Sequence, residues 1–288
     1  MLKIENISKT FDGNKVLDNI NIDVNNGSIY GLIGKNGVGK TTLMNIVAGL
    51  STPDTGVCGV YGENEQRIDG AKVGYLPDLP SFFEYLSAKE YIDFLLMNSG
   101  NKQLSQRRDE LLKTVGVPAK SKVGTMSRGM KQRLGIAAAL VNDPEVILLD
   151  EPTSALDPMG RYELMEILNN LKNSGKSILL STHILADMEK VCDKVGFLHN
   201  GIIQKEVDIA DFAYGESSSW VVTFEHPFYC DLTLVEGVSV RKLTEITYVF
   251  ESTEQKRILE ALMKISTRIV HIGNQRKSLD DWFQEVCK

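Results

Sequence analysis

The stretch Gly34-Lys35-Asn36-Gly37-Val38-Gly39-Lys40-Thr41 fits the pattern G-x-x-x-x-G-K-[ST]. An apolar strand over 28–33 is predicted before it, and a helix is predicted after it. Glycines let backbone N–H groups surround phosphate oxygens, and the helix presents its positive end to the anion. Lys40 is expected to reach the outer phosphates, and the Thr41 hydroxyl is placed for Mg²⁺. The alternative, a glycine-rich turn with a chance lysine, leaves the four fixed positions of this eight-residue pattern, and its place between a strand and a helix, unexplained.

A phosphate-binding loop of this kind needs a second, acidic site, and the chain offers one. The apolar run over 146–149 predicts a buried strand that ends in Asp150 and Glu151. Taken alone, such a pair is the solvated start of a loop. After a phosphate-binding loop, we expect Asp150 to hold Mg²⁺ through water and Glu151 to orient or polarise an attacking water.

The composition is that of a globular chain. It has 288 residues, of which 42% are hydrophobic and 24% are charged, and its formal net charge is −6. This acidic balance argues against a nucleic-acid partner. No apolar run has the length of a bilayer span or a signal peptide, so we expect neither membrane insertion nor export. The four cysteines are scattered without a C-x-x-C pair and are expected to be reduced thiols.

The patterning predicts an α/β fold with several parts. Short antiparallel strands precede the glycine-rich stretch, a helical region covers about 78–142, and Asn200-Gly201 predicts a hairpin turn. We expect a first domain with the phosphate-binding loop over 1–207, a linker over 208–219 and a small α+β domain over 220–288. In this last part, Ser252 is expected to cap a helix and Ser278 to begin the final one.

Residues 126–133 add a further motif, Met126-Ser127-Arg128-Gly129-Met130-Lys131-Gln132-Arg133. Together with the two sites above it makes residues 2–205 resemble the ATP-binding subunits of ABC (ATP-binding cassette) transporters. The motif resembles the family signature LSGGQ-x-x-R; Ser127 and Gly129 match, whereas Met126, Arg128 and Met130 depart. Ser127 can still cap the following helix, whose N-terminus can bind a γ-phosphate. The alternative is an ordinary capped amphipathic helix.

The resemblance implies a P-loop NTPase of the ABC ATPase type, with ATP and Mg²⁺ as ligands. The loop residues that it assigns to ATP are Gly34, Asn36, Gly37, Gly39, Lys40, Thr41 and Thr42. Phe11 matches the aromatic position that stacks on adenine, although alone it would be a core aromatic. His183, in Ser181-Thr182-His183, matches the switch histidine, which in this family contacts the γ-phosphate and steadies the catalytic geometry, although a lone histidine after a strand is often structural.

Two loops complete the resemblance. Residues 154–157 match the D-loop, and Asp157 before Pro158 is also a good helix cap. Residues 74–78 lie where the family has its Q-loop, but Asp78 replaces the usual Gln or Glu and is shorter. Asp78 either joins the Mg²⁺ site through water, or serves coupling to a membrane partner, or is an exposed loop acid.

In this family the nucleotide lies between the loop of one chain and the signature helix of another. A homodimer, or a heterodimer with another cassette, is therefore implied, driven closed by ATP. The resemblance implies a polytopic permease partner at the cytoplasmic face of the membrane. The ending at 278–283 resembles the ABC-2-type exporter branch, which includes cassettes that clear peptide antibiotics. The alternative is a soluble ABC-type ATPase acting on ribosomes or DNA. Members of those classes usually carry two cassettes in one chain or a long coiled coil, and this sequence has neither.

Overall fold

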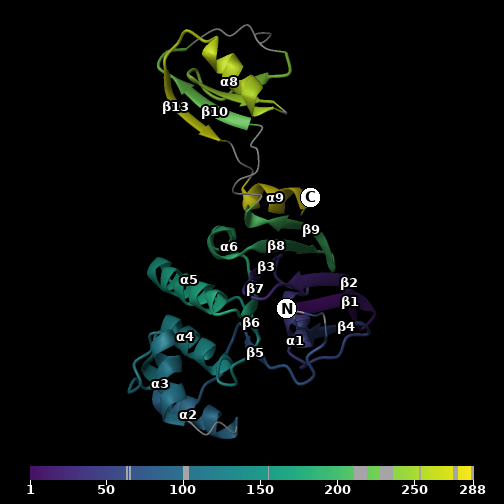
Figure 1. The fold of residues 1–288 in the computed structure, drawn as a ribbon, viewed down its shortest axis with the longest axis vertical. Coiled ribbons are helices and arrows are strands. Elements are labelled where there is room, and N and C mark those ends of the chain that lie inside the picture. Colours follow the sequence, from purple (N-terminus) through teal and green to yellow (C-terminus); the bar gives the residue numbers. More distant parts are fainter. Residues whose placement is uncertain are drawn as a thin grey trace. The chain divides into compact units, whose positions relative to one another are not determined.

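The computed structural model describes residues 1–62, 64, 66–99, 104–154, 156–210, 219–227, 236–252, 254–274 and 278–286. The chain forms two compact units (Figure 1), one of Met1–Ile209 with Phe283–Lys288 and one of Ala210–Trp282. The end of the chain, from Phe283 on, thus groups with the first unit. The sequence pattern predicts instead that all of 220–288 belongs to the second domain. Most of the expected linker at 208–219 lies outside the described residues.

A six-stranded sheet forms the centre of the first unit. Its order is β5 (Val73–Leu76), β6 (Val146–Asp150), β7 (Ser177–Thr182), β3 (Ile29–Ile33), β8 (Lys194–His199) and β9 (Ile202–Asp208). The first five strands are parallel, and β9 is antiparallel to β8 through the expected turn at Asn200-Gly201. Strands β3, β6 and β7 are buried throughout, as their continuous apolar runs predict. Their carboxyl ends meet at one edge of the sheet.

A second, antiparallel sheet has the order β2 (Asn14–Val24), β1 (Leu2–Phe11) and β4 (Thr55–Val60). Its alternating apolar residues share one hydrophobic core with the central sheet and with α1 (Lys40–Val47). Members of this core from β1, β2, α1 and β6 include Leu2, Ile22, Leu43 and Leu148. This packing fixes α1, and therefore the loop before it, against both sheets.

The helical part lies beyond β5. It contains α2 (Ala88–Asn98), α3 (Leu104–Thr114), the 3₁₀ turn η1 (Val123–Thr125) and α4 (Arg128–Ala139) (Figure 1). A capping box between Ser87 and Glu90 starts α2, because each side chain satisfies a backbone N–H of the other. Helix α4 packs on β5, where a Cβ placed on Gly135 would lie 2.5 Å from Leu76 Cδ1.

Helices over 158–173 and 185–191 also belong to the first unit. Helix α5 (Pro158–Asn173) begins as expected, with Asp157 as its cap and Pro158 at its first position. Helix α6 (Leu185–Val191) packs closely on β3: a Cβ placed on Gly31 would lie only 2.5 Å from Met188 Sδ.

The described residues of the second unit form a four-stranded antiparallel sheet. The strand order is β11 (Ser239–Lys242), β12 (Thr247–Glu251), β10 (Ser219–Phe224) and β13 (Ile269–Asn274), and α8 (Gln255–Met263) packs on it. The prediction that Ser252 caps α8 was wrong: Glu254 is the cap residue, and the Ser252 hydroxyl accepts from its backbone N–H at 3.3 Å. The last helix, α9 (Leu279–Val286), follows Ser278 as predicted.

Candidate functional site

The loop between β3 and α1 follows a path that requires glycine. Gly37 and Gly39 have φ values of 79° and 115°, in the region that side chains disfavour. A Cβ on Gly34 would lie 2.7 Å from the Leu198 carbonyl oxygen. The backbone of the loop therefore keeps a fixed turn, and its residues stay at the N-terminus of α1, where an anion is favoured.

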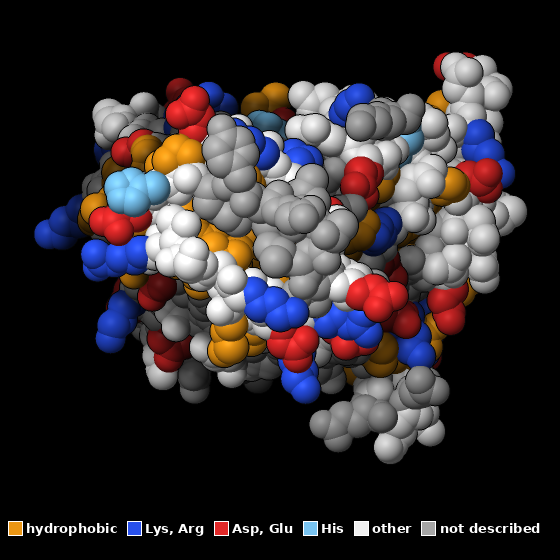
Figure 2. Space-filling model, turned by 90° about the horizontal axis from the view of Figure 1, so that it is seen from above, with side chains coloured by type: hydrophobic (Ala, Val, Ile, Leu, Met, Phe, Trp, Pro, Cys, Tyr) orange, Lys and Arg blue, Asp and Glu red, His pale blue; other side chains and the backbone are white. Residues whose placement is uncertain are grey.

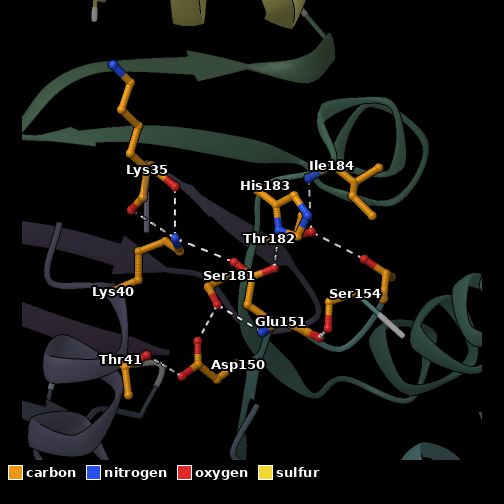
Figure 3. A network of polar contacts seen from close by, with 12 residues as sticks. Lys35, Lys40, Thr41, Asp150, Glu151, Ser154, Ser181, Thr182, His183 and Ile184 are labelled. Atoms are coloured by element: carbon orange, nitrogen blue, oxygen red, sulfur yellow. Dashed lines mark hydrogen bonds and ion pairs between the residues drawn. The ribbon is translucent and has the colours of Figure 1, made fainter. Parts of the chain in front are cut away.

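Lys40 begins α1 and folds back over the loop (Figure 3). Its Nζ donates to the carbonyl oxygens of Gly34 at 2.8 Å and Lys35 at 3.2 Å, and lies 3.4 Å from Glu151 Oε1. Its side chain is 6% exposed, so the cation is held almost out of water. Lys35 by contrast extends away from this network in Figure 3.

Thr41 and Asp150, 109 positions apart in sequence, are joined directly. Thr41 Oγ1 donates to Asp150 Oδ2 at 2.6 Å, and Ser181 Oγ donates to Asp150 Oδ1 at 2.5 Å (Figure 3). Asp150 is 1% exposed. The two hydroxyls occupy both oxygens of a buried carboxylate, which fixes its orientation at the end of β6.

Glu151 has an unusual backbone, with φ at 50°. Its N–H donates to the oxygen atoms of Ser181, both the carbonyl at 3.1 Å and Oγ at 3.0 Å. Its Oε2 lies 2.8 Å from His183 Nδ1, and its buried Oε1 has no hydrogen-bond partner among the described residues. A strained backbone and an incompletely satisfied buried carboxylate are typical of functional sites.

Asp78 follows β5, next to β6 in the sheet, and its side chain is exposed. Desolvation by neighbouring protein atoms and the charges of Asp150 and Glu151 raise the pKa of Asp78. Burial, aided by Asp150 and Asp78, also raises the pKa of Tyr75 to about 12. The structure therefore brings Asp78 into the electrostatic field of the acid pair.

Phe11 is the last residue of β1, the central strand of the small sheet, and is 46% exposed. Lys9 Nζ lies 5.3 Å from the centre of its ring. The ring does not belong to the core, so the alternative of a core aromatic at Phe11 is excluded. Its exposed face is available for stacking.

The signature residues lie in a separate place. Ser127 caps α4 by accepting from Met130 N at 3.2 Å, and Gly129 packs on Leu156, which a Cβ would approach to 3.2 Å. Together with Asp157 of the D-loop they line a cavity of about 390 Å³. The P-loop residues do not line this cavity. The D-loop itself is described except for residue 155.

The remaining loop residues keep the places that the motif gives them. Asn36 is exposed within the loop, and Thr42 lies in the first turn of α1. Sequence reasoning missed Ser181 as a member of the site, although it is fully buried and contacts both acids. The signal available was a serine near the carboxyl end of a buried parallel strand, where ligand sites of such sheets gather.

Comparison with known proteins agrees with this geometry. Residues 17–154 match the ABC transporter family model. The Bacitracin transport ATP-binding protein BcrA of Bacillus licheniformis is 37% identical over 99% of this chain and 97% of its own length. The Lantibiotic transport ATP-binding protein SrtF of Streptococcus pyogenes is 39% identical, over 72% and 92% respectively.

A solved dimeric structure of MJ0796, a bacterial ABC transporter cassette, superposes with a TM-score of 0.64. Its sequence is 26% identical, and the match covers 73% of this chain and 99% of that one. The predicted fold class is thereby confirmed. The family match and these sequence relatives show that the chain belongs to the ATP-binding, ATP-hydrolysing subunits of ABC transporters, and its fold agrees with this.

Proposed function

We propose that the network around Lys40, Thr41, Asp150 and Glu151 is the site at which this subunit hydrolyses ATP. The main support is the 2.6 Å hydrogen bond between Thr41 and Asp150, which joins the P-loop helix to the end of β6. In this proposal the loop N–H groups and Lys40 bind the β- and γ-phosphates. An arriving phosphate competes for Lys40 with the two loop carbonyls that the ammonium now contacts.

The Thr41 hydroxyl and the Asp150 carboxylate are hard oxygen donors that fit Mg²⁺. Among the described residues no three acidic, histidine or cysteine side chains converge as a complete metal shell. Mg²⁺ commonly keeps several waters and uses one or two protein ligands with substrate phosphates, so this sparse donor set suits it. Bound there, the ion would neutralise charge on the phosphates.

Glu151 is proposed to accept a proton from the attacking water. Ser181 fixes its backbone, and His183 holds one of its carboxylate oxygens at 2.8 Å. The other oxygen, Oε1, is kept near the Lys40 cation at 3.4 Å. His183 is 53% exposed, so it can turn toward a γ-phosphate while staying beside Glu151.

A complete site is proposed to require two chains, as a homodimer or with a related cassette. Ser127 and Gly129 line a cavity apart from the P-loop, at an exposed helix N-terminus that favours an anion. The MJ0796 cassette, which has the same fold, was solved as a dimer, and this supports the arrangement. The expected adenine contact is Phe11, whose ring is accessible.

The permease is proposed to dock beside α2. Leu79, Phe83, Tyr85, Phe94 and Met97 are between 44% and 77% exposed. Phe83 forms ring contacts with Tyr85 at 6.0 Å and with Phe94 at 5.5 Å. Exposed apolar clusters of this kind mark interaction sites.

Among the helices the structure describes, none is long and apolar enough to span a bilayer. The proposed location is the cytoplasmic face of the membrane, held by that permease.

The proposed cargo is a peptide antibiotic, exported from the cell. The support is the bacitracin transport relative, because the match with it extends over both units of this chain. Basic and acidic side chains are interspersed on the face in Figure 2, which agrees with a net charge of −6 and does not favour nucleic acid.

Two measurements test these proposals. Expression with its permease should raise the bacitracin concentration that inhibits a sensitive host, and Lys40→Ala should abolish the effect. Co-purification with unchanged sensitivity would contradict the cargo. Tyr85→Ala should weaken co-purification with the permease and leave ATP turnover of the isolated subunit unchanged. Undiminished co-purification of Tyr85→Ala and of Phe83→Ser would place docking elsewhere.

A further inference from the structure

Lys9 of β1 has an unusual environment for a lysine. Its side chain is only 14% exposed, although lysine side chains in proteins are mostly exposed. Its Nζ donates to Asp54 Oδ1 at 3.0 Å and lies over the ring of Phe11, 5.3 Å from the ring centre. The cation is therefore held by a carboxylate and an aromatic ring.

Asp54, which precedes β4, fixes the position of this cation. Its backbone N–H donates to the Ser8 carbonyl oxygen at 2.9 Å, and its Oδ2 accepts from the Thr10 backbone N–H at 2.7 Å. Together with the ion pair to Lys9, these contacts join Asp54 to three consecutive residues of β1. The ammonium is thus held at one place, although the side chain of a lysine is flexible.

The ring of Phe11 receives this cation on one of its faces. Lys9 and Phe11 are two positions apart in β1, so their side chains lie on the same side of the strand. The face of an aromatic ring carries partial negative charge, which attracts a cation. Because Phe11 is still 46% exposed, the contact orients the ring and leaves much of it open to a ligand.

We propose that Lys9 is a positioning residue for the adenine of the nucleotide and acts by orienting the Phe11 ring. This inference rests on the proposed stacking of adenine on Phe11. With the ammonium over one face of the ring, the base stacks on the other. The ring is oriented before the nucleotide arrives, so less side-chain freedom is lost on binding. The cation also draws the π electrons of the ring toward itself, which lessens their repulsion with those of the base.

The first arm of the test examines the contact between Lys9 and Phe11 without nucleotide. Lys9→Met, Phe11→Leu and the double variant form a cycle for urea unfolding of the full chain. The cycle cancels the separate ion pair between Lys9 and Asp54. We expect a coupling of about two- to fivefold in the unfolding equilibrium constant, which is the size of an exposed cation–π contact.

The second arm compares, by calorimetry, the binding of ADP with that of inorganic pyrophosphate, which has the phosphates and no base. Phe11→Leu should weaken ADP binding about tenfold, as expected for the loss of base stacking, and leave pyrophosphate binding unchanged. Lys9→Met should weaken ADP binding about threefold, again without an effect on pyrophosphate. In the background of Phe11→Leu, the effect of Lys9→Met on ADP should fall to less than half.

Two further variants separate a positioning role from a general loss of stability or charge. Lys9→Arg keeps a cation over the ring and should restore parental ADP binding. Lys3→Met is the matched control, because Lys3 also belongs to β1 and its Nζ lies over the ring of Tyr61, 5.6 Å from the ring centre. It should leave ADP binding unchanged.

Equal losses of ADP and pyrophosphate affinity in Lys9→Met would overturn the proposal, because Lys9 would then act on the phosphates. An effect of Lys9→Met on ADP that is the same with and without the Phe11 ring, or that Lys3→Met reproduces, would overturn it as well. If Phe11→Leu binds ADP like the parent, the proposed adenine contact fails and the role of Lys9 in nucleotide binding fails with it. The unfolding cycle would then still show whether Lys9 orients the ring.

Discussion

Ser181 is fully buried at the end of β7, and its hydroxyl contacts both acids of the site. Ser181→Ala should leave Asp150 Oδ1 without this donor and destabilise the fold by about 1–3 kcal/mol. ATP turnover should fall as well, because the orientation of both acids is loosened. Ser154→Ala is the matched control, since Ser154 Oγ bonds the Glu151 carbonyl from an exposed position. Urea unfolding measures the loss of stability, and a steady-state assay measures the loss of ATP turnover. Equal losses in Ser181→Ala and Ser154→Ala would contradict the role of Ser181.

Glu151→Gln keeps the shape of the side chain and removes its charge. Nucleotide binding should survive, while turnover falls by about 10² or more if Glu151 is a general base. Calorimetry of ATP binding and a phosphate-release assay separate the two effects. Glu260→Gln, at an exposed position of α8, should change neither quantity. Parental turnover in Glu151→Gln would remove Glu151 from the chemistry.

The part of the site that was predictable from the sequence is the part encoded in contiguous residues. Lys40 and Thr41 belong to one uninterrupted motif, and Asp150 follows an apolar strand. Ser181 and Tyr75 were not identified, because their relation to Asp150 depends on strands β5, β6 and β7 being neighbours. Strand order is a property of tertiary packing, and local patterns do not determine it.

At the scale of elements, Asp143 joins the helical part to the central sheet. Its Oδ1 accepts from Lys176 Nζ at 2.8 Å, beside β7, and lies 3.4 Å from Arg107 Nη2 of α3. Its hydrogen bond with Lys176 lowers the pKa of Asp143 below its ordinary 3.8. A lowered carboxyl pKa stabilises the fold above 3.8, and this stabilisation is lost as pH falls through the folded-state pKa.

Asp143→Asn should therefore reduce the free energy of unfolding at neutral pH. Because Asp143 is 69% exposed, the reduction should be modest, about 0.5 kcal/mol. Urea unfolding at several pH values should show the difference from the parent shrinking below about pH 3.8. Glu166→Gln, exposed on α5, should show no such trend. A difference that is independent of pH would exclude the ion pair as its cause.

Elements with strong periodicity were predicted, and weakly patterned ones were not. The buried runs of β3, β6 and β7 and the capped helices α2 and α5 have clear local signals. Strand β4, which was not predicted, reads TGVCGV, with two glycines and little burial. Strand β9 was expected only as the second arm of the hairpin at Asn200-Gly201, and it is half buried along its length. Both strands form because neighbouring strands pair with them, so tertiary context determines them.

The sequence pattern predicts two domains, but it does not show with which of them the last residues of the chain group. Phe283 lies with the first unit, where its ring centre is 6.5 Å from that of Phe197 on β8. An amphipathic helix shows which of its faces is apolar, and it does not show which surface covers that face. The assignment of 283–288 therefore required the tertiary structure.

We propose that each ATP site combines the P-loop of one chain with the signature helix of another. The direct test mixes a Lys40→Ala chain with a Ser127→Arg chain, both carrying Glu151→Gln so that hydrolysis does not reopen the dimer. Light scattering after size exclusion measures dimers with and without ATP–Mg²⁺. Each variant alone should remain monomeric, and the mixture should form ATP-dependent heterodimers that retain one intact site. If the mixture stays monomeric under conditions in which Glu151→Gln alone dimerises, or if Ser127→Arg dimerises as well as its parent, the two-chain site is contradicted.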